Sequence, residues 1–192
     1  MIKAILTAAC FLSVFANAQK DESATYKIDA SHTAVVFKIS HLGFSHTYGQ
    51  FPDVAGSFTI NESKPEKSTL ELSMDVDKIN TFDAKRDKHL KSPDFFNSKQ
   101  FPKITFKSKS VKKVSANNYE ISGDLTMHGV TKPLTFTFVR SRTGQDPWGN
   151  TRTGGDTTFK VKRSDFGMTY MQGENQIGDE VELIVSVEGI RK

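Results

Sequence analysis

The side chains that could do chemistry in this sequence are histidines and a few cations. Among the five histidines, His41 and His46 lie close together while His32 and His128 lie far from them, and no HxH or HExxH spacing occurs. Histidines alone could form a metal site, but neither of these recognisable zinc-ligand spacings is present, so we expect no metal ion and no cofactor. No GxSxG motif occurs and no serine–histidine spacing indicates a triad. The sequence therefore favours a protein that is not an enzyme.

Arg163 is the cation most in need of a partner. It shares strand parity with Phe159 and Val161 and would point into the protein, where an unpaired charge costs on the order of several kcal/mol. The partner is either an anionic group of a ligand or an acid such as Asp165, and we favour the acid.

Arg86 and His89 are two further candidates for contact with the polar head of a ligand. They lie three residues apart and would share one face of a helix. Contacts that fix their own segment are the simpler interpretation of both.

Alternating apolar and polar residues predict the elements that position these side chains. The residues 35–39, 54–60, 70–76, 104–106, 119–127, 134–138, 159–163 and 181–187 alternate with period two. This pattern predicts eight strands of an all-β, antiparallel sheet with one apolar face. Such a sheet closes into a barrel or folds into a sandwich, and an eight-stranded barrel is either filled or holds one small ligand.

The apolar residues on the inward face are the candidate lumen residues. They are Phe37, Ile39, Phe58, Ile60, Leu72, Met74, Phe106, Leu125, Phe136, Phe138, Phe159, Val161, Leu183 and Val185. The composition alone leaves open whether they fill the interior or surround a hollow.

Two segments break the strand pattern. Residues 81–97 predict a short helical insert, with Asp83 as its N-cap and a second cap at Ser92 before Pro93. Residues 141–158 contain four glycines and predict a long, mobile loop.

The first residues predict a signal peptide. Lys3 precedes an apolar run over residues 4–16, and Ala16-Asn17-Ala18 is a small-x-small cleavage site. We therefore expect a signal peptide over residues 1–18, a mature domain over 19–192, and a periplasmic or secreted location. Lipidation at Cys10 is a weaker alternative. Because Cys10 is the only cysteine, cleavage leaves a mature chain without disulfides or thiolate chemistry.

The charge of the chain excludes one class of partner. A net charge of +4 is too small to indicate nucleic-acid binding. One lysine-rich run, at positions 99, 103, 107, 109, 112 and 113, has no acid within it. It suggests either transient contact with an anionic membrane surface or solvated lysines on the outer face of a strand. We favour the second.

Several motifs, in a fixed order, resemble those of one family. They are residues 26–32 (YKIDASH), Val36-Phe37, 41–44 (HLGF), 86–96 (RDKHLKSPDFF), 101–106 (FPKITF), 123–133 (GDLTMHGVTKP), 163–167 (RSDFG) and 178–181 (GDEV). Together they resemble the YceI-like family of polyisoprenoid-binding, lipocalin-like exported proteins, over residues 26–190.

The resemblance implies an extended eight-stranded antiparallel barrel whose lumen binds a long isoprenoid or a similar amphiphile. It implies carriage or sequestration rather than catalysis, and homodimers occur among such relatives. Quinones, polyprenyl phosphates and fatty acids or amides all stay open as ligands. The alternatives to a carrier are a filled barrel that acts as an interaction module and, less favoured, a hydrolase of lipid-linked substrates.

Overall fold

The longest strand closes the sheet on itself. In the computed structural model, which describes residues 23–192, β11 (Ile177–Arg191) pairs along one edge with β10 (Thr151–Lys162). Along its other edge it pairs with β1 (Ser23–Ile28) and β2 (Ala34–His41). The remaining strands are β3 (Ser45–Phe51), β4 (Ala55–Asn61), β5 (Thr69–Asp75), β6 (Lys103–Lys113), β7 (Asn118–Met127), β8 (Val130–Arg140) and the short β9 (Gly144–Gln145).

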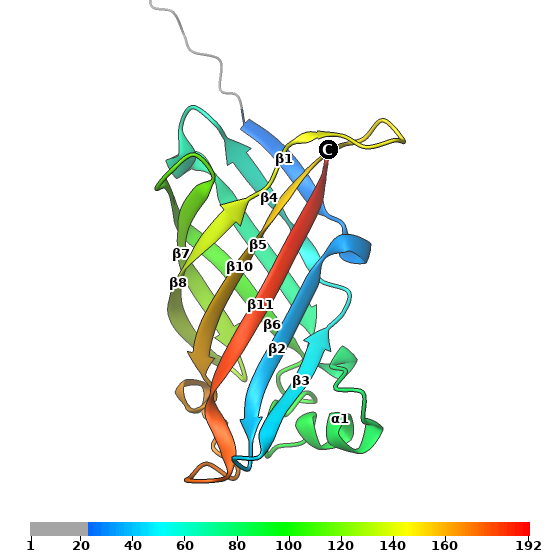
Figure 1. Ribbon diagram of the computed structural model, residues 1–192, viewed down its shortest axis with the longest axis vertical. Helices are drawn as coiled ribbons and strands as arrows, with labels where there is room; N and C mark the ends of the chain where they lie inside the picture. The colour runs from blue at the N-terminus through cyan, green and yellow to red at the C-terminus, as the bar shows by residue number, and fades with distance from the viewer. Residues whose placement is uncertain (1–22) are drawn as a thin grey trace, which may run out of the picture.

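The barrel wall has eight strand positions, as predicted. β1 and β2 are two halves of one wall strand, interrupted by the 3₁₀ helix η1 (Ala30–His32). Because β1 pairs with β4 and β2 with β3, the halves β3 and β4 fill the next position. Then β5, β6, β7, β8, β10 and β11 complete the closed antiparallel barrel seen in Figure 1. The alternation of apolar residues did not predict β1, β3 or the short β9, since few of their residues are apolar.

The long loop predicted over residues 141–158 is wrong in its second half. β10 already begins at Thr151, and Gly154 and Gly155 lie inside it. A Cβ at Gly154 would lie 2.3 Å from the Val187 carbonyl oxygen, and one at Gly155 equally close to that of Val139. These glycines therefore permit close contact between strands rather than a loop.

The predicted insert forms one short helix beside the lower end of the barrel (Figure 1). In α1 (Ala84–Leu90), the Asp83 carboxylate accepts hydrogen bonds from the backbone N–H groups of Lys85 and Arg86, which confirms Asp83 as the N-cap. At the second predicted cap, the Ser92 hydroxyl accepts a hydrogen bond from the Asp94 backbone N–H at 3.3 Å, but turns rather than a helix follow it. Within residues 23–192, no helix has the length and apolar character needed to cross a bilayer. The predicted signal peptide and Cys10 lie outside the described residues.

Four of the five lysines of β6 lie on the outside of the barrel, in ion pairs across neighbouring strands. These are Lys103–Asp75, Lys107–Glu71, Lys109–Asp124 and Lys112–Glu120. A β-bulge between Ser108 and Ser110 reverses the parity of the strand, so that Val111 points inward. Lys113 then has the inward parity, contrary to the alternation we assumed, and its ammonium group lies 5.8 Å from the Tyr119 ring centroid.

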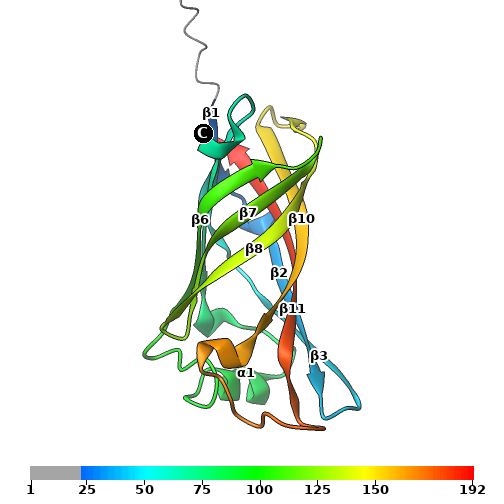
Figure 2. The same ribbon diagram turned by 90° about the vertical axis from the view of Figure 1, so that its left-hand side faces the viewer.

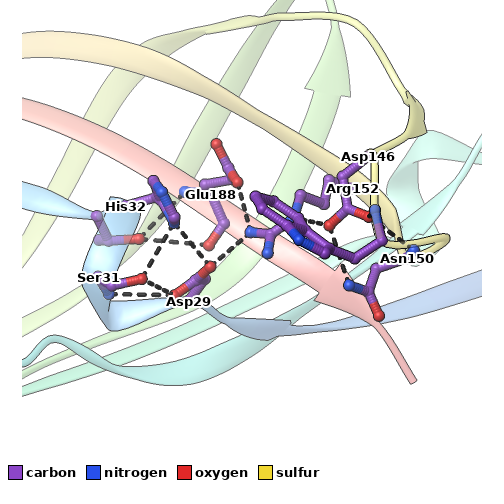
Figure 3. Close-up of polar contacts among 9 residues, drawn as sticks. Asp29, Ser31, His32, Asp146, Asn150, Arg152 and Glu188 are labelled. Atoms are coloured by element: carbon purple, nitrogen blue, oxygen red, sulfur yellow. Dashed lines mark hydrogen bonds and ion pairs between the residues drawn. The ribbon is translucent and has the colours of Figure 1, made fainter.

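A cluster of charges joins η1 to β10 and β11 (Figure 3). The Arg152 guanidinium donates to the carboxylates of Asp29, Glu188 and Asp146. Asp29 also accepts hydrogen bonds from Ser31, and these, together with Arg152, hold its pKa well below the usual range. The cluster fixes the point where β1 and β2 separate.

We expect Arg152→Met to lower the Tm at pH 7 by roughly 5 °C, because three carboxylates lose their shared cation. The depressed pKa of Asp29 means that this stability is present above the ordinary carboxyl pKa of about 3.9 and is lost as the pH falls below it. The Tm difference between wild type and variant should therefore shrink between pH 4 and pH 2 in thermal melts. A difference that stays constant with pH would contradict this assignment.

Candidate functional site

A large apolar cavity occupies the part of the barrel nearest α1. Its volume is about 530 Å³, within the ~300–1,000 Å³ typical of small-ligand sites. All but two of the predicted lumen residues line it: Phe37, Ile39, Leu72, Met74, Phe106, Leu125, Phe136, Phe138, Phe159, Val161, Leu183 and Val185. The interior is therefore hollow over this part of its length.

The far end of the barrel is packed with side chains around one small void. A cluster that we call the plug consists of Leu70, Phe106, Val111, Tyr119 and Ile121, all buried. Leu70 and Phe106 also face the main cavity and form its floor.

The two remaining predicted lumen residues, Phe58 and Ile60, lie at the plug end. They line a separate small void of about 70 Å³, and the Phe58 ring stacks on Tyr26 at a centroid distance of 5.1 Å. Both side chains point to the inside of the barrel, as predicted, but they lie nearer its plug end and therefore do not reach the main cavity.

The mouth of the cavity lies beside α1. His89 packs edge-on against Phe95 and Tyr170, with ring centroids 5.1 Å away in both cases, and its Nε2 lies 2.8 Å from an Asp94 carboxylate oxygen. Exposed Lys85 also lines the cavity here. His89 was a predicted site residue, but Phe95 and Tyr170 were not, because nothing local to either residue shows that the two segments meet.

Arg86 lines the mouth and also fixes the insert. Its Nε donates to the Thr81 hydroxyl at 2.8 Å and its Nη2 to the Thr81 carbonyl oxygen at 2.6 Å. Asp87 accepts hydrogen bonds from the backbone N–H and the hydroxyl of the same threonine. Because Thr81 is almost fully buried, these contacts hold α1 against the barrel.

Arg163 is buried, and backbone carbonyl groups satisfy its guanidinium. It begins the 3₁₀ helix η4 (Arg163–Phe166) and donates to the carbonyl oxygens of Gly178 and Met168, both at 2.8 Å, and of Ile177 at 3.0 Å. Burial lowers its pKa, since desolvation disfavours the charged form.

Asp165, the acid that we named as the partner of Arg163, is wrong, since the carboxylate whose charge raises the pKa of Arg163 against the effect of burial is that of Asp179. Asp165 is exposed, while Asp179 accepts hydrogen bonds from the backbone N–H and the hydroxyl of Ser164. Since the guanidinium donates to carbonyl groups on both sides of residues 169–176, Arg163 holds the loop that carries Tyr170 at the mouth.

Residues 26–189 match the model of the YceI-like domain. The chain belongs to the YceI-like family. It is 40% identical over 193 residues to Protein YceI of Escherichia coli O17:K52:H18 (strain UMN026 / ExPEC), with all of both chains covered.

Two solved structures share the YceI-like barrel. Burkholderia cenocepacia BcnA superposes with a TM-score of 0.74 at 21% identity, covering 84% of this chain and 98% of that one. A polyisoprenoid binding domain from Saccharophagus degradans, implicated in plant cell wall breakdown, gives a TM-score of 0.66 at 15% identity, covering 87% and 98%. At these identities the likeness concerns the fold.

One group of side chains in the described part of this YceI-like chain has the spacing of metal ligands. Ligand atoms of Asp29, His32 and Glu188 lie within 4.8 Å of one another. However, Arg152 already donates to both carboxylates from among them (Figure 3). A guanidinium there supplies the positive charge that a metal ion would bring, so we interpret the group as an ion-pair cluster.

We expect Arg163→Met to lower the free energy of unfolding by about 3 kcal/mol, because several buried carbonyl groups lose their donor. Arg163→Lys should also destabilise, since an ammonium group cannot reproduce the planar fork of donors. Urea unfolding of the purified variants tests both. If Arg163 were instead a ligand contact only, both variants would keep wild-type stability and lose affinity alone.

Proposed function

We propose that this protein binds the apolar tail of a long isoprenoid or similar amphiphile in its lumen and carries or sequesters it without chemical change. The observation that carries the proposal is the cavity of about 530 Å³, whose lining is mostly aliphatic and aromatic. The family membership and the description of the Saccharophagus domain as polyisoprenoid binding support it. A hollow interior favours a carrier over a filled interaction module.

The energetics suit a ligand held mainly by its tail. Burial of one CH₂ group contributes about 0.8 kcal/mol, so a twenty-carbon tail contributes on the order of 16 kcal/mol before other terms. Association costs roughly 4–15 kcal/mol, which the tail alone can offset. The lumen therefore selects for apolar tails, and a quinone or a polyprenyl lipid meets that requirement.

The polar head of the ligand lies at the mouth in this proposal. Lys85, Arg86 and His89 line the cavity there. Arg86 uses Nε and Nη2 on Thr81, and His89 uses Nε2 on Asp94. The ammonium group of Lys85 and the Nη1 of Arg86 are therefore the donors that best suit a phosphate, a carboxylate or a quinone oxygen. Arg163 is left out of this set, because its nitrogens already donate to backbone carbonyl groups.

Export to the periplasm or the medium is part of the same proposal. The predicted signal peptide supports it, and a protein there could take up lipid during transient contact with a membrane. Whether it does so as a monomer or as a homodimer is answered by the masses measured in the experiment below.

We expect Leu72→Arg to abolish bound lipid, because it places a charge in the apolar lumen, where a bound tail could not shield it. The control is Ser73→Arg on the same strand: Leu72 lines the cavity and its neighbour has the outward parity. Native mass spectrometry of protein purified without detergent, followed by organic extraction, measures the lipid. Circular dichroism shows which variants are folded. Unchanged lipid in folded Leu72→Arg would contradict lumen binding.

A further inference from the structure

The barrel wall contains a gap between β8 and β10. Among the described residues these strands pair at two positions, Gly155 with Arg140 and Asp156 with Val139. Beyond them β10 stays paired with β11 as far as Lys162, and β8 stays paired with β7 as far as Val130. Figure 2 shows β8 and β10 running apart toward the end of the barrel that carries α1. The hydrogen-bonded ladder is therefore missing between β8 and β10, while each of the two strands stays paired along its other edge.

Side-chain contacts close the gap at both ends. At the upper end, the Thr157 hydroxyl donates to the Thr137 carbonyl oxygen at 2.7 Å, where a backbone bond would otherwise be expected. At the lower end, His128 Nδ1 lies 2.8 Å from the Phe166 carbonyl oxygen and joins the β7–β8 turn to η4. We call the bounded opening between these two contacts the window.

The window coincides with a cavity that shares walls with the lumen. This cavity has a volume of about 330 Å³ and lies between the two separated strands. Three of its residues, Leu125, Leu134 and Val161, also line the main cavity. The window is therefore separated from the lumen by apolar side chains and not by a hydrogen-bonded ladder.

Two stacked rings stand across the window on the lumen side. Phe136 of β8 and Phe159 of β10 have centroids 5.1 Å apart and planes 19° apart. If the register that pairs Asp156 with Val139 continued along both strands, Phe159 would lie directly opposite Phe136. A ring pair contributes only about 0.5–1.5 kcal/mol beyond burial, so the rings can separate without loss of any backbone pairing in the wall.

The outer rim of the window keeps its strand edges in water. Lys132, Lys160 and Lys162 are exposed along it, and Pro133 lacks a backbone N–H. Lysine and proline are the residues that keep a free strand edge from pairing with another chain. The rim is thus suited to an edge that stays open.

We propose that the apolar tail of the ligand enters and leaves the lumen sideways through the window, and that Phe136 and Phe159 separate to let it pass. This inference rests on the proposed function. A tail that enters at the mouth must thread past Lys85, Arg86 and His89 along its whole length. A tail that passes through the window moves broadside between the apolar side chains of Leu134 and Val161 once it is inside the lysine rim, and it disturbs none of the pairing that β8 keeps with β7 and β10 with β11.

The test is to bridge the window chemically and to measure exchange of all-trans-retinol, a fluorescent isoprenoid. Thr135→Cys and Lys160→Cys, in a Cys10→Ser background, place one thiol on each outer edge, and a reducible bismaleimide joins them. The control pair is Glu71→Cys and Lys107→Cys, which are register partners on β5 and β6. Both double variants lose one surface ion pair, Lys160–Glu180 or Lys107–Glu71.

We expect the bridge across the window to slow retinol uptake at least tenfold in stopped-flow fluorescence. Retinol loaded before bridging should be released at least tenfold more slowly. Reduction of the bridge should restore both rates, and the control bridge should change neither. Uptake and release at the unbridged rates would overturn the window and make the mouth the route. An unbridged protein that binds no retinol would instead refute the proposed function, and the inference with it.

Discussion

The pairing of β11 along both of its edges is the constraint on which the rest of the structure depends. It closes the sheet into a wall and sets the number of strand positions at eight. Among the described residues the edges left without a ladder are those at the window and the outer edges of β3 and β9, and on its outer edge β3 has the single bridge between Gln50 and Asn80. That number fixes the width of the interior to about what side chains can fill. Side chains such as Val111 and Tyr119 fill it at one end, while at the other end the phenylalanines and aliphatic residues of the lining leave the cavity between them.

Three arginines show how the barrel accommodates cations close to its apolar interior. Arg152 is matched by carboxylates, Arg163 by backbone carbonyl groups, and Arg86 by the hydroxyl and carbonyl of Thr81. Each holds an irregular segment against the regular wall: η1, the loop at the mouth, and α1. The apolar lumen thus depends on polar contacts at its ends, because loops without a hydrophobic face need other means of fixation.

Much of the lumen could be predicted because inward orientation is a local property of a strand. The alternation around Leu72 or Leu183 indicates which face is apolar, and the cavity is lined accordingly. Features that depend on distant partners could not be found in this way. The bulge that turns Lys113, the carbonyl partners of Arg163 and the strand role of Gly154 and Gly155 all follow from contacts with remote backbone.

The plug gives the lumen a fixed depth. Leu70 and Phe106 close the cavity at one end, and the mouth lies at the other. The end of a tail bound inside would therefore contact these packed side chains. A barrel of this kind acts as a ruler: a tail shorter than the depth leaves empty space, and one that is longer must leave its last carbons in water. Under the proposed function, chain length thus joins head-group chemistry as a property by which the protein would distinguish lipids, and the residues that set this length are those of the plug.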